Sequence, residues 1–167
     1  MKQKLRVVCL AATQEKGGSE MNTPVAQVLD RKGREVETIA PTETVYNAVK
    51  RMEEKGIGCL VVLGKSGRIA GILSERDCIR KAFLPDGQEP HKLLVKDVMT
   101  KKVVYVTSDT TVDDCMALIT QKRIRHLPVI EADKLAGIIS IGDLVKFVSH
   151  EQDLMIRNLE KYIEGSL

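Results

Sequence analysis

The chain has 167 residues, of which 43% are hydrophobic, 29% are charged and only 3% are aromatic. This balance is typical of a globular domain, and its core must consist of aliphatic side chains because tryptophan is absent. The net charge of +3 is too small to indicate a nucleic-acid-binding protein, and no apolar run approaches the roughly 20 residues that cross a bilayer. We therefore expect no nucleic acid and no membrane among its partners.

The first 22 residues differ in character from the rest of the chain. Their apolar stretch, residues 7–12, hardly reaches the roughly 7 to 15 apolar residues of a secretion signal, and a polar, glycine-rich segment follows it. We expect residues 1–22 to form a flexible leader. The four cysteines have no C-x-x-C spacing, which indicates reduced thiols and a cytoplasmic location rather than a zinc or redox site.

After this leader the chain contains an internal repeat. Residues 45–62 align with residues 112–129, and residues 70–77 align with residues 136–143, in the same order. A match that keeps its order over two segments indicates two copies of one structural unit.

Each copy has the same predicted elements. Apolar residues at positions i, i+3, i+4 and i+7 predict an amphipathic helix that begins at Val45 or Val112. A buried strand, a turn, a second strand and a helix from Ser74 or Ser140 follow. With short strands at residues 36–39 and 103–106, the unit is β-α-β-β-α. One unit of about 60 residues is marginal by itself, so we expect the copies to pack through their sheets around one shared core.

The repeats define the expected organisation of the chain. The first repeat occupies residues 23–88, a linker occupies residues 89–96 and the second repeat occupies residues 97–150. Residues 151–167 contain apolar positions that suggest a C-terminal amphipathic helix. That helix either packs on the repeats or forms a dimer contact.

The most specific segments are Gly71–Asp77 and Gly137–Asp143, each a glycine and two apolar residues followed by Ser-x-x-Asp. With them, and with residues 98–100, 106–112 and 125–129, the chain from about residue 25 to residue 150 resembles the CBS-domain pair, or Bateman module, of the stand-alone type. The resemblance implies an α/β (α+β) fold of two tandem β-α-β-β-α repeats packed sheet to sheet with pseudo-twofold symmetry. It also implies a homodimer and two inter-repeat pockets for an adenine nucleotide such as AMP, ATP or NAD.

The two Ser-x-x-Asp motifs allow two interpretations. Ser74 with Asp77, and Ser140 with Asp143, have the spacing of a capping box, in which the serine and the acidic residue satisfy the free N–H groups of a helix start. In the binding interpretation, the serine hydroxyl donates to phosphate or ribose and the carboxylate accepts from the ribose hydroxyls. The two roles are compatible.

The walls of the pockets are expected to come from strand residues. Ile57 and Cys59 in the first copy, and the segment around His126 and Pro128 in the second, offer apolar surface for an adenine ring. The resemblance also pairs the early strand of one repeat with the motif of the other. It thus places residues 38–40 near Ser140 and residues 105–107 near Ser74. Thr38 and Thr107 are then either ligand contacts or ordinary β-branched strand residues.

Residues 122–126 form the densest basic cluster of the chain, which is either a solvated face or a phosphate clamp. Arg76 is a similar candidate in the first copy. Arg125 and His126 align with Gly58 and Cys59, so we expect the two pockets to bind ligand unequally. The candidate nucleotide-binding residues are Thr38, Ile57, Cys59, Ser74, Arg76, Asp77, Thr107, Arg125, His126, Pro128, Ser140 and Asp143.

The sequence offers no candidate for catalysis. No nucleophile–base pair surrounds His126, and the chain has neither a P-loop nor a dinucleotide fingerprint. Three scattered histidines do not indicate a metal site. We therefore expect no enzyme and no catalytic cofactor, but a sensor that binds an adenine nucleotide and signals to a separate, unidentified regulated protein. The alternatives are a structural or adaptor dimer with empty pockets and, more weakly, a nucleic-acid binder that uses residues 122–126.

Overall fold

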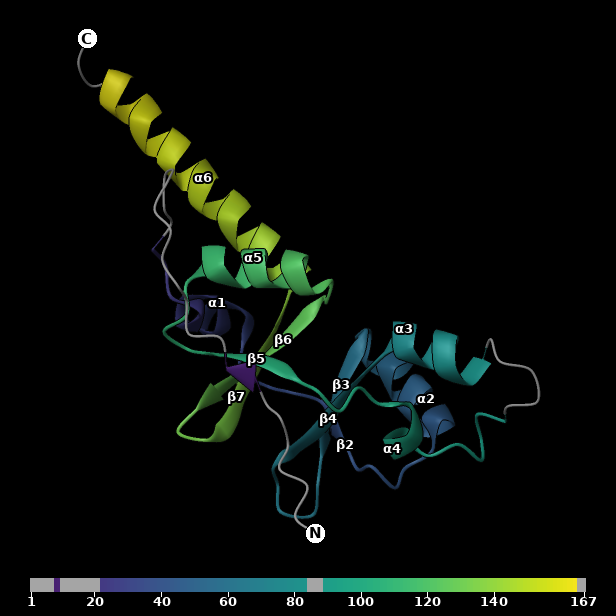
Figure 1. Ribbon diagram of the computed structural model, residues 1–167. Coiled ribbons are helices and arrows are strands. Elements are labelled where there is room, and N and C mark those ends of the chain that lie inside the picture. The colour runs from purple at the N-terminus through teal and green to yellow at the C-terminus, as the bar shows by residue number, and fades with distance from the viewer. Residues whose placement is uncertain (1–7, 10–21, 84–88, 165–167) are drawn as a thin grey trace.

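The computed structural model describes residues 8–9, 22–83 and 89–164 (Figure 1). The helices are α1 (Val25–Lys32), α2 (Val45–Lys55), α3 (Glu75–Cys78), the π-helical turn η1 (Ile79–Phe83), α4 (Val95–Val98), α5 (Val112–Lys122) and α6 (Ile141–Glu164). The strands are β1 (Val8–Cys9), β2 (Thr38–Ile39), β3 (Cys59–Leu63), β4 (Ile69–Ser74), β5 (Val104–Thr107), β6 (His126–Glu131) and β7 (Lys134–Ser140).

The strands form two sheets, one for each repeat. Strands β2, β3 and β4 form a three-stranded sheet, and β1, β5, β6 and β7 form a four-stranded one. In both sheets the early strand pairs in parallel with the next strand, which pairs antiparallel with its hairpin partner. The predicted α/β fold of two β-α-β-β-α repeats is confirmed, and the amphipathic helices begin at Val45 and Val112 as the periodicity predicts.

The two repeats exchange their short leading helices. Helix α1 precedes the first sheet in sequence but packs on the second, and α4 precedes the second sheet but packs on the first (Figure 1). The backbone contacts are duplicated as well: Val25 N donates to Thr110 O at 2.8 Å, and Val95 N donates to Glu43 O at 2.8 Å. By sequence order residues 25–32 belong to the first repeat, whereas by packing they belong to the second.

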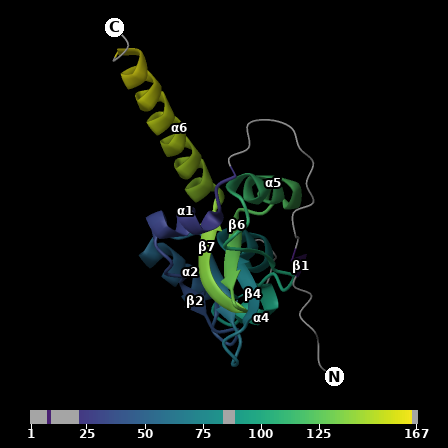
Figure 2. The same ribbon diagram turned by 90° about the vertical axis from the view of Figure 1, so that its left-hand side faces the viewer.

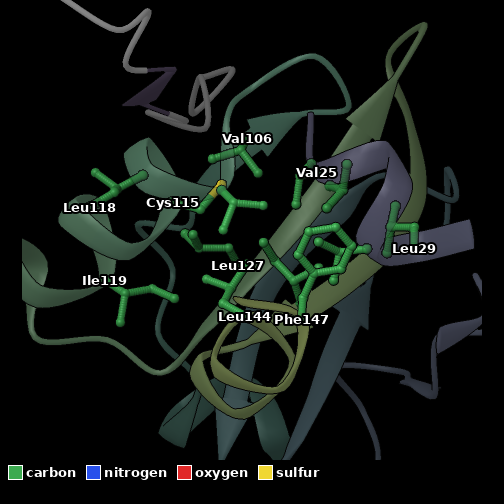
Figure 3. Packing of buried hydrophobic residues seen from close by; sticks show 13 residues of the cluster. Val25, Leu29, Val106, Cys115, Leu118, Ile119, Leu127, Leu144 and Phe147 are labelled. Carbon is green, nitrogen blue, oxygen red and sulfur yellow. The ribbon is translucent and has the colours of Figure 1, made fainter. Parts of the chain in front are cut away.

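The apolar core consists of two clusters, so the prediction of one shared core is wrong. One cluster joins α1, α5, α6 and the second sheet, and includes Leu29, Leu127 and Phe147 (Figure 3). The other joins α2, α4 and the first sheet. Each exchanged helix completes the core of the opposite repeat. Each sheet therefore has its own core on the face that the helices cover. The other sheet faces lie toward each other and bury Val61 and Pro128.

Two equivalent glycines allow the exchanged helices to approach the sheets. A Cβ atom at Gly137 would lie 2.7 Å from Leu29 Cδ2, and one at Gly71 would lie 2.6 Å from Met99 Sδ and 3.0 Å from the Thr100 carbonyl oxygen. Only a residue without a side chain permits such close contact. These glycines thus position both exchanged segments.

The predicted C-terminal helix is the continuation of α6, a single 24-residue helix from Ile141 to Glu164. Its first part buries Leu144 and Phe147, whereas residues 152–164 are all exposed and project away from the sheets (Figures 1 and 2). Packing on the repeats therefore does not account for the apolar residues in this part. In the described residues, no helix is long and apolar enough to span a membrane.

Parts of the predicted leader and the end of the predicted first repeat lie outside the described residues, namely residues 1–7, 10–21 and 84–88. Within the expected leader, the backbone of Val8 and Cys9 forms β1, which pairs in parallel with Val104 and Tyr105. These two residues add a strand to the edge of the second sheet.

The close approach at Gly71 generates a test of the helix exchange. We expect Gly71→Ala to lower the free energy of unfolding by roughly 1–3 kcal/mol, the usual cost of overpacking, because backbone as well as side-chain atoms oppose the added methyl group. Urea unfolding of both proteins measures the difference. The control is Gly64→Ala, where the nearest atom is 3.7 Å from the added Cβ. Equal stability of Gly71→Ala and Gly64→Ala would contradict the close approach of Met99 and Thr100 to Gly71.

Candidate functional site

Among the pockets that the described residues form between the repeats, two lie next to a Ser-x-x-Asp motif. The first pocket has a volume of about 670 Å³ and joins the motif that begins at Ser74 to residues 102–104 and 123–126 of the second repeat. The second pocket has a volume of about 310 Å³ and joins Ser140 and Asp143 to residues 35–37 and 56–59 of the first repeat. Both volumes lie within the usual range for small-molecule sites.

The two pockets are related by the internal repeat. Residues 102–104 and 123–126 of the first pocket align with residues 35–37 and 56–59 of the second. Ile72 in one corresponds to Ile138 in the other. The protein thus contains two versions of one site, which differ where the two repeats differ in sequence.

The motif at the first pocket forms the predicted capping box. Ser74 Oγ donates to Asp77 Oδ2 at 2.7 Å, and Asp77 N donates to Ser74 Oγ at 3.2 Å. Lys81 Nζ lies 2.7 Å from Asp77 Oδ1, and Thr100 Oγ1 donates to the same oxygen at 3.3 Å. Burial opposes ionisation of Asp77, but the contacts with Lys81 and Ser74 outweigh it and hold the pKa of the carboxyl below its ordinary value.

The motif at the second pocket repeats this geometry with a different lysine. Ser140 Oγ donates to Asp143 Oδ2 at 2.8 Å, Asp143 N donates back at 3.2 Å, and Lys32 Nζ lies 2.8 Å from the same carboxylate oxygen. Lys32 is the last residue of α1 and reaches the motif because α1 packs on the second sheet. Burial again opposes ionisation, yet Lys32 and the Ser140 hydrogen bonds keep the pKa of Asp143 below its ordinary value.

A shared wall separates the two pockets. Gly58, Cys59 and His126 line both of them, and a Cβ atom on Gly58 would lie 3.8 Å from His126 Cε1. Burial lowers the pKa of His126 against the opposing effect of Asp143, so the ring is neutral near pH 7. Burial also raises the pKa of Cys59 to about 12, which leaves an unreactive thiol.

Most of the candidate residues line a pocket, but three do not. Ser74, Arg76, Asp77 and Arg125 line the first pocket, Ile57, Ser140 and Asp143 line the second, and Cys59 and His126 line both. Pro128 is buried between the sheets and lines neither pocket.

Thr38 and Thr107 also line neither pocket, and the reason is the strand register. In the parallel pairs, Thr38 lies beside Val61 and Val106 lies beside Val129. This register places residues 35–37, not 38–40, next to the Gly58 end of β3, and residues 102–104, not 105–107, next to the start of β6. The Thr38 carbonyl accepts from Arg51, and Thr107 Oγ1 donates to Asp109 in the following turn. Each motif therefore lies near the early strand of the other repeat, as predicted, but the residues that approach it are three positions earlier in the chain.

Sequence reasoning missed several residues that line the pockets: Lys32, Glu35, Glu37, Arg80, Lys81 and Lys102. A second internal match would have pointed to the exchanged helices, because Val25, Val28 and Leu29 have the same spacing as Val95, Val98 and Met99. Nothing local to Lys32 indicates its contact with Asp143.

The described residues contain no group of three or more His, Cys, Asp or Glu side chains placed to hold a metal ion. The three cysteines whose side chains are described, Cys59, Cys78 and Cys115, are buried and free. Burial raises the pKa of each, to about 12 for Cys59 and Cys115 and about 11 for Cys78. Thiolate chemistry is therefore unfavourable at these positions.

The Lys32–Asp143 pair predicts a pH-dependent stability. Since the pKa of Asp143 lies below its unfolded value of about 3.9, the pair stabilises the fold above that pH, and the contribution disappears as the pH falls through the folded-state pKa. We expect Asp143→Asn to be less stable than the parent at pH 7, with the difference shrinking between about pH 5 and pH 2. Denaturant unfolding across this range measures it, with Asp153→Asn on the exposed part of α6 as the matched control. A difference that stays constant with pH would contradict the assignment.

Comparison with known proteins agrees with this architecture. The sequence profile described as "CBS domain" matches residues 21–83 and 95–150. CBS domain-containing protein CBSX3, mitochondrial, from Arabidopsis thaliana is 38% identical over 162 residues, which cover 92% of this chain and 78% of that protein.

Solved structures agree as well. A protein with CBS domains from Burkholderia ambifaria has 47% identity and a TM-score of 0.74, and the match covers 78% of this chain and 96% of that one. A hexameric CBS-CP12 protein from bloom-forming cyanobacteria has 32% identity and a TM-score of 0.67, covering 75% and 68%. With two matched repeats, two sheets and two related pockets, the chain belongs to the CBS-domain family and is a CBS-domain pair, the kind of module that generally serves regulation.

Proposed function

We propose that the protein is a sensor that binds an adenine nucleotide between its repeats and signals to a separate protein. The observation that carries this proposal is the first pocket, a cavity of about 670 Å³ that the two repeats build together. It combines apolar walls, a partly buried carboxylate and several basic side chains. This combination matches the three parts of a nucleotide, namely base, ribose and phosphate.

Each part of the nucleotide has a candidate partner in the pocket. Ile72, Val104 and Ile124 provide the apolar surface for the adenine ring. Asp77 accepts hydrogen bonds and has a side chain that is 19% exposed, so ribose hydroxyls can reach it. Arg123 and Arg125 line the cavity, which favours the phosphate-clamp interpretation of the basic cluster over a merely solvated face.

Signalling follows from the position of the pocket between two separate cores. A ligand there contacts both repeats at once, and each repeat is held to the other by an exchanged helix. A nucleotide that binds one arrangement of the repeats more tightly than another shifts the population toward that arrangement. A partner protein then detects the changed surface. We place this module in the cytoplasm, although the Arabidopsis relative is named as mitochondrial.

We also propose that the protein is a homodimer and that the outer half of α6 contributes to its interface. Met155, Leu159 and Tyr162 follow one another at spacings of four and three residues, with exposed fractions of 66%, 54% and 78%. This spacing is that of a coiled-coil seam, and an identical seam on a second copy is complementary to it under twofold symmetry. A helix that projects from its domain is marginal in water without such cover. The hexameric cyanobacterial relative supports self-association in this family.

Nucleotide binding is tested by thermal unfolding with AMP, ADP, ATP, NAD and GTP. At about 100 times its dissociation constant, a bound adenine nucleotide should add roughly 2.7 kcal/mol of stability. We expect Asp77→Ala to lose this ligand-induced rise, whatever its own stability, because the ribose contact is removed. Asp97→Ala, an acidic residue of α4 outside the pocket, should keep the rise. No rise with any adenine nucleotide at millimolar concentration would favour the adaptor with empty pockets.

The dimer is tested by light scattering coupled to size-exclusion chromatography. We expect twice the chain mass of 18.5 kDa for the parent and the single chain mass for Leu159→Glu, because a charge in the apolar seam opposes pairing. Residues 152–164 are exposed within one chain, so the substitution should leave the fold intact. Arg157→Glu, two positions away and on the opposite side of the helix, is the control. A dimeric Leu159→Glu would exclude this seam as the interface.

A further inference from the structure

The two pockets have opposite charge although they occupy equivalent positions. The first pocket is lined by six cationic side chains and two carboxylates: Arg76, Arg80, Lys81, Lys102, Arg123 and Arg125 against Glu75 and Asp77. The second is lined by one cation and three carboxylates: Lys32 against Glu35, Glu37 and Asp143. The neutral His126 borders both and does not alter this contrast.

The contrast arises at positions that match one another in the repeat. Lys102 corresponds to Glu35, and the three arginines of the first pocket at positions 76, 123 and 125 correspond to Gly142, Gly56 and Gly58. The same local fold therefore forms with a glycine or an acid at these four positions. Formation of the repeat does not require the basic side chains.

Arg123 supports this interpretation through its backbone conformation. It ends α5 in the left-handed region, with φ 52° and ψ 39°, whereas the corresponding Gly56 ends α2 with φ 62° and ψ 36°. Glycine adopts this conformation without strain, and an arginine does not. Arg123 therefore stands at a position whose backbone favours glycine, and it lines the first pocket.

Most of these cations have no internal counter-charge. Lys81 pairs with Asp77, whereas in the described part of the chain no carboxylate lies within ion-pair distance of Arg76, Arg80, Lys102, Arg123 or Arg125. Cations gathered around one cavity repel one another and attract anions. An anion with several charges relieves that repulsion best.

We infer that the first pocket is selective for adenine nucleotides with two or more phosphates and that the second pocket rejects them. This inference rests on the proposed nucleotide binding and adds the phosphate number and the choice of pocket. In the second pocket, Lys32 is already neutralised by Asp143 at 2.8 Å, and Glu37 pairs with Lys55 at 3.3 Å. Among the described residues Glu35 has no ion-pair partner, so its carboxylate opposes an approaching phosphate. That pocket is also less than half as large.

The test is a calorimetric titration of the full chain with adenosine, AMP, ADP and ATP. We expect affinity to rise with the number of phosphates, with ATP at least about tenfold tighter than AMP, because charge-assisted hydrogen bonds to arginine are strong. The affinity for ATP should fall steeply with added salt, whereas that for adenosine should not. We expect one ATP for each chain.

Substitutions then separate phosphate contacts from general effects. Arg125→Ala should weaken ATP by roughly tenfold or more and change the affinity for adenosine less than twofold. Lys102→Glu, which copies the residue of the second pocket, should act in the same direction. Arg157→Ala on the exposed part of α6 changes the net charge by the same amount as Arg125→Ala and should leave both affinities unchanged.

The outcomes distinguish this inference from the proposed function. Equal affinity for AMP and ATP, or an Arg125→Ala variant that weakens adenosine and ATP alike, would overturn the phosphate selectivity and leave nucleotide binding intact. Two ATP molecules for each chain would overturn the rejection by the second pocket. No binding of any of the four compounds would overturn the proposed function, and this inference with it.

Discussion

The exchange of α1 and α4 between the repeats is the contact on which the rest of the structure depends. Each helix supplies buried residues to the core of the opposite repeat, and each is seated against a glycine whose replacement would meet packed atoms. Equivalent backbone hydrogen bonds from Val25 and Val95 hold the first residue of each exchanged helix. Because neither repeat completes its own core, the two cannot separate without exposing apolar surface. The cleft between them is therefore a permanent feature of the fold.

The exchange also determines the chemistry of the pockets. Lys32 reaches Asp143 only because α1 lies on the second sheet, and Thr100, just after α4, reaches Asp77 in the same way. Each capping box thus has a second role: it starts a helix and holds a carboxylate at the edge of a cleft. A ligand that competes for this carboxylate acts directly on a contact between the repeats, which gives binding a route to the geometry of the whole module.

Much of this architecture could be predicted from the sequence. The repeat, its β-α-β-β-α order and both capping boxes follow from local spacing and from an internal match. The pockets between the repeats follow from the resemblance to the CBS-domain pair. The predictions that failed concern packing between residues that are far apart in the sequence. The position of α1 on the second sheet and the division into two cores are set by fit against Gly137, and no local pattern expresses that fit. The pocket contacts of Thr38 and Thr107 failed because parallel register, which a sequence does not specify, moves the cleft three residues along both early strands.

The internal repeat offers a comparison within one molecule, because each pocket serves as a control for the other. The shared features, two capping boxes and an apolar wall, are what the fold requires or tolerates in both places. The fold does not require the features that are found in one pocket alone, and most of these features are charged side chains. Arg125 corresponds to Gly58 in the repeat, and Lys102 corresponds to Glu35. Arg123 even occupies a backbone conformation that suits its counterpart Gly56 better. With structural symmetry and electrostatic asymmetry, the two pockets offer a charged ligand unequal sites, and this inequality is the basis of the phosphate selectivity that we infer for the first pocket.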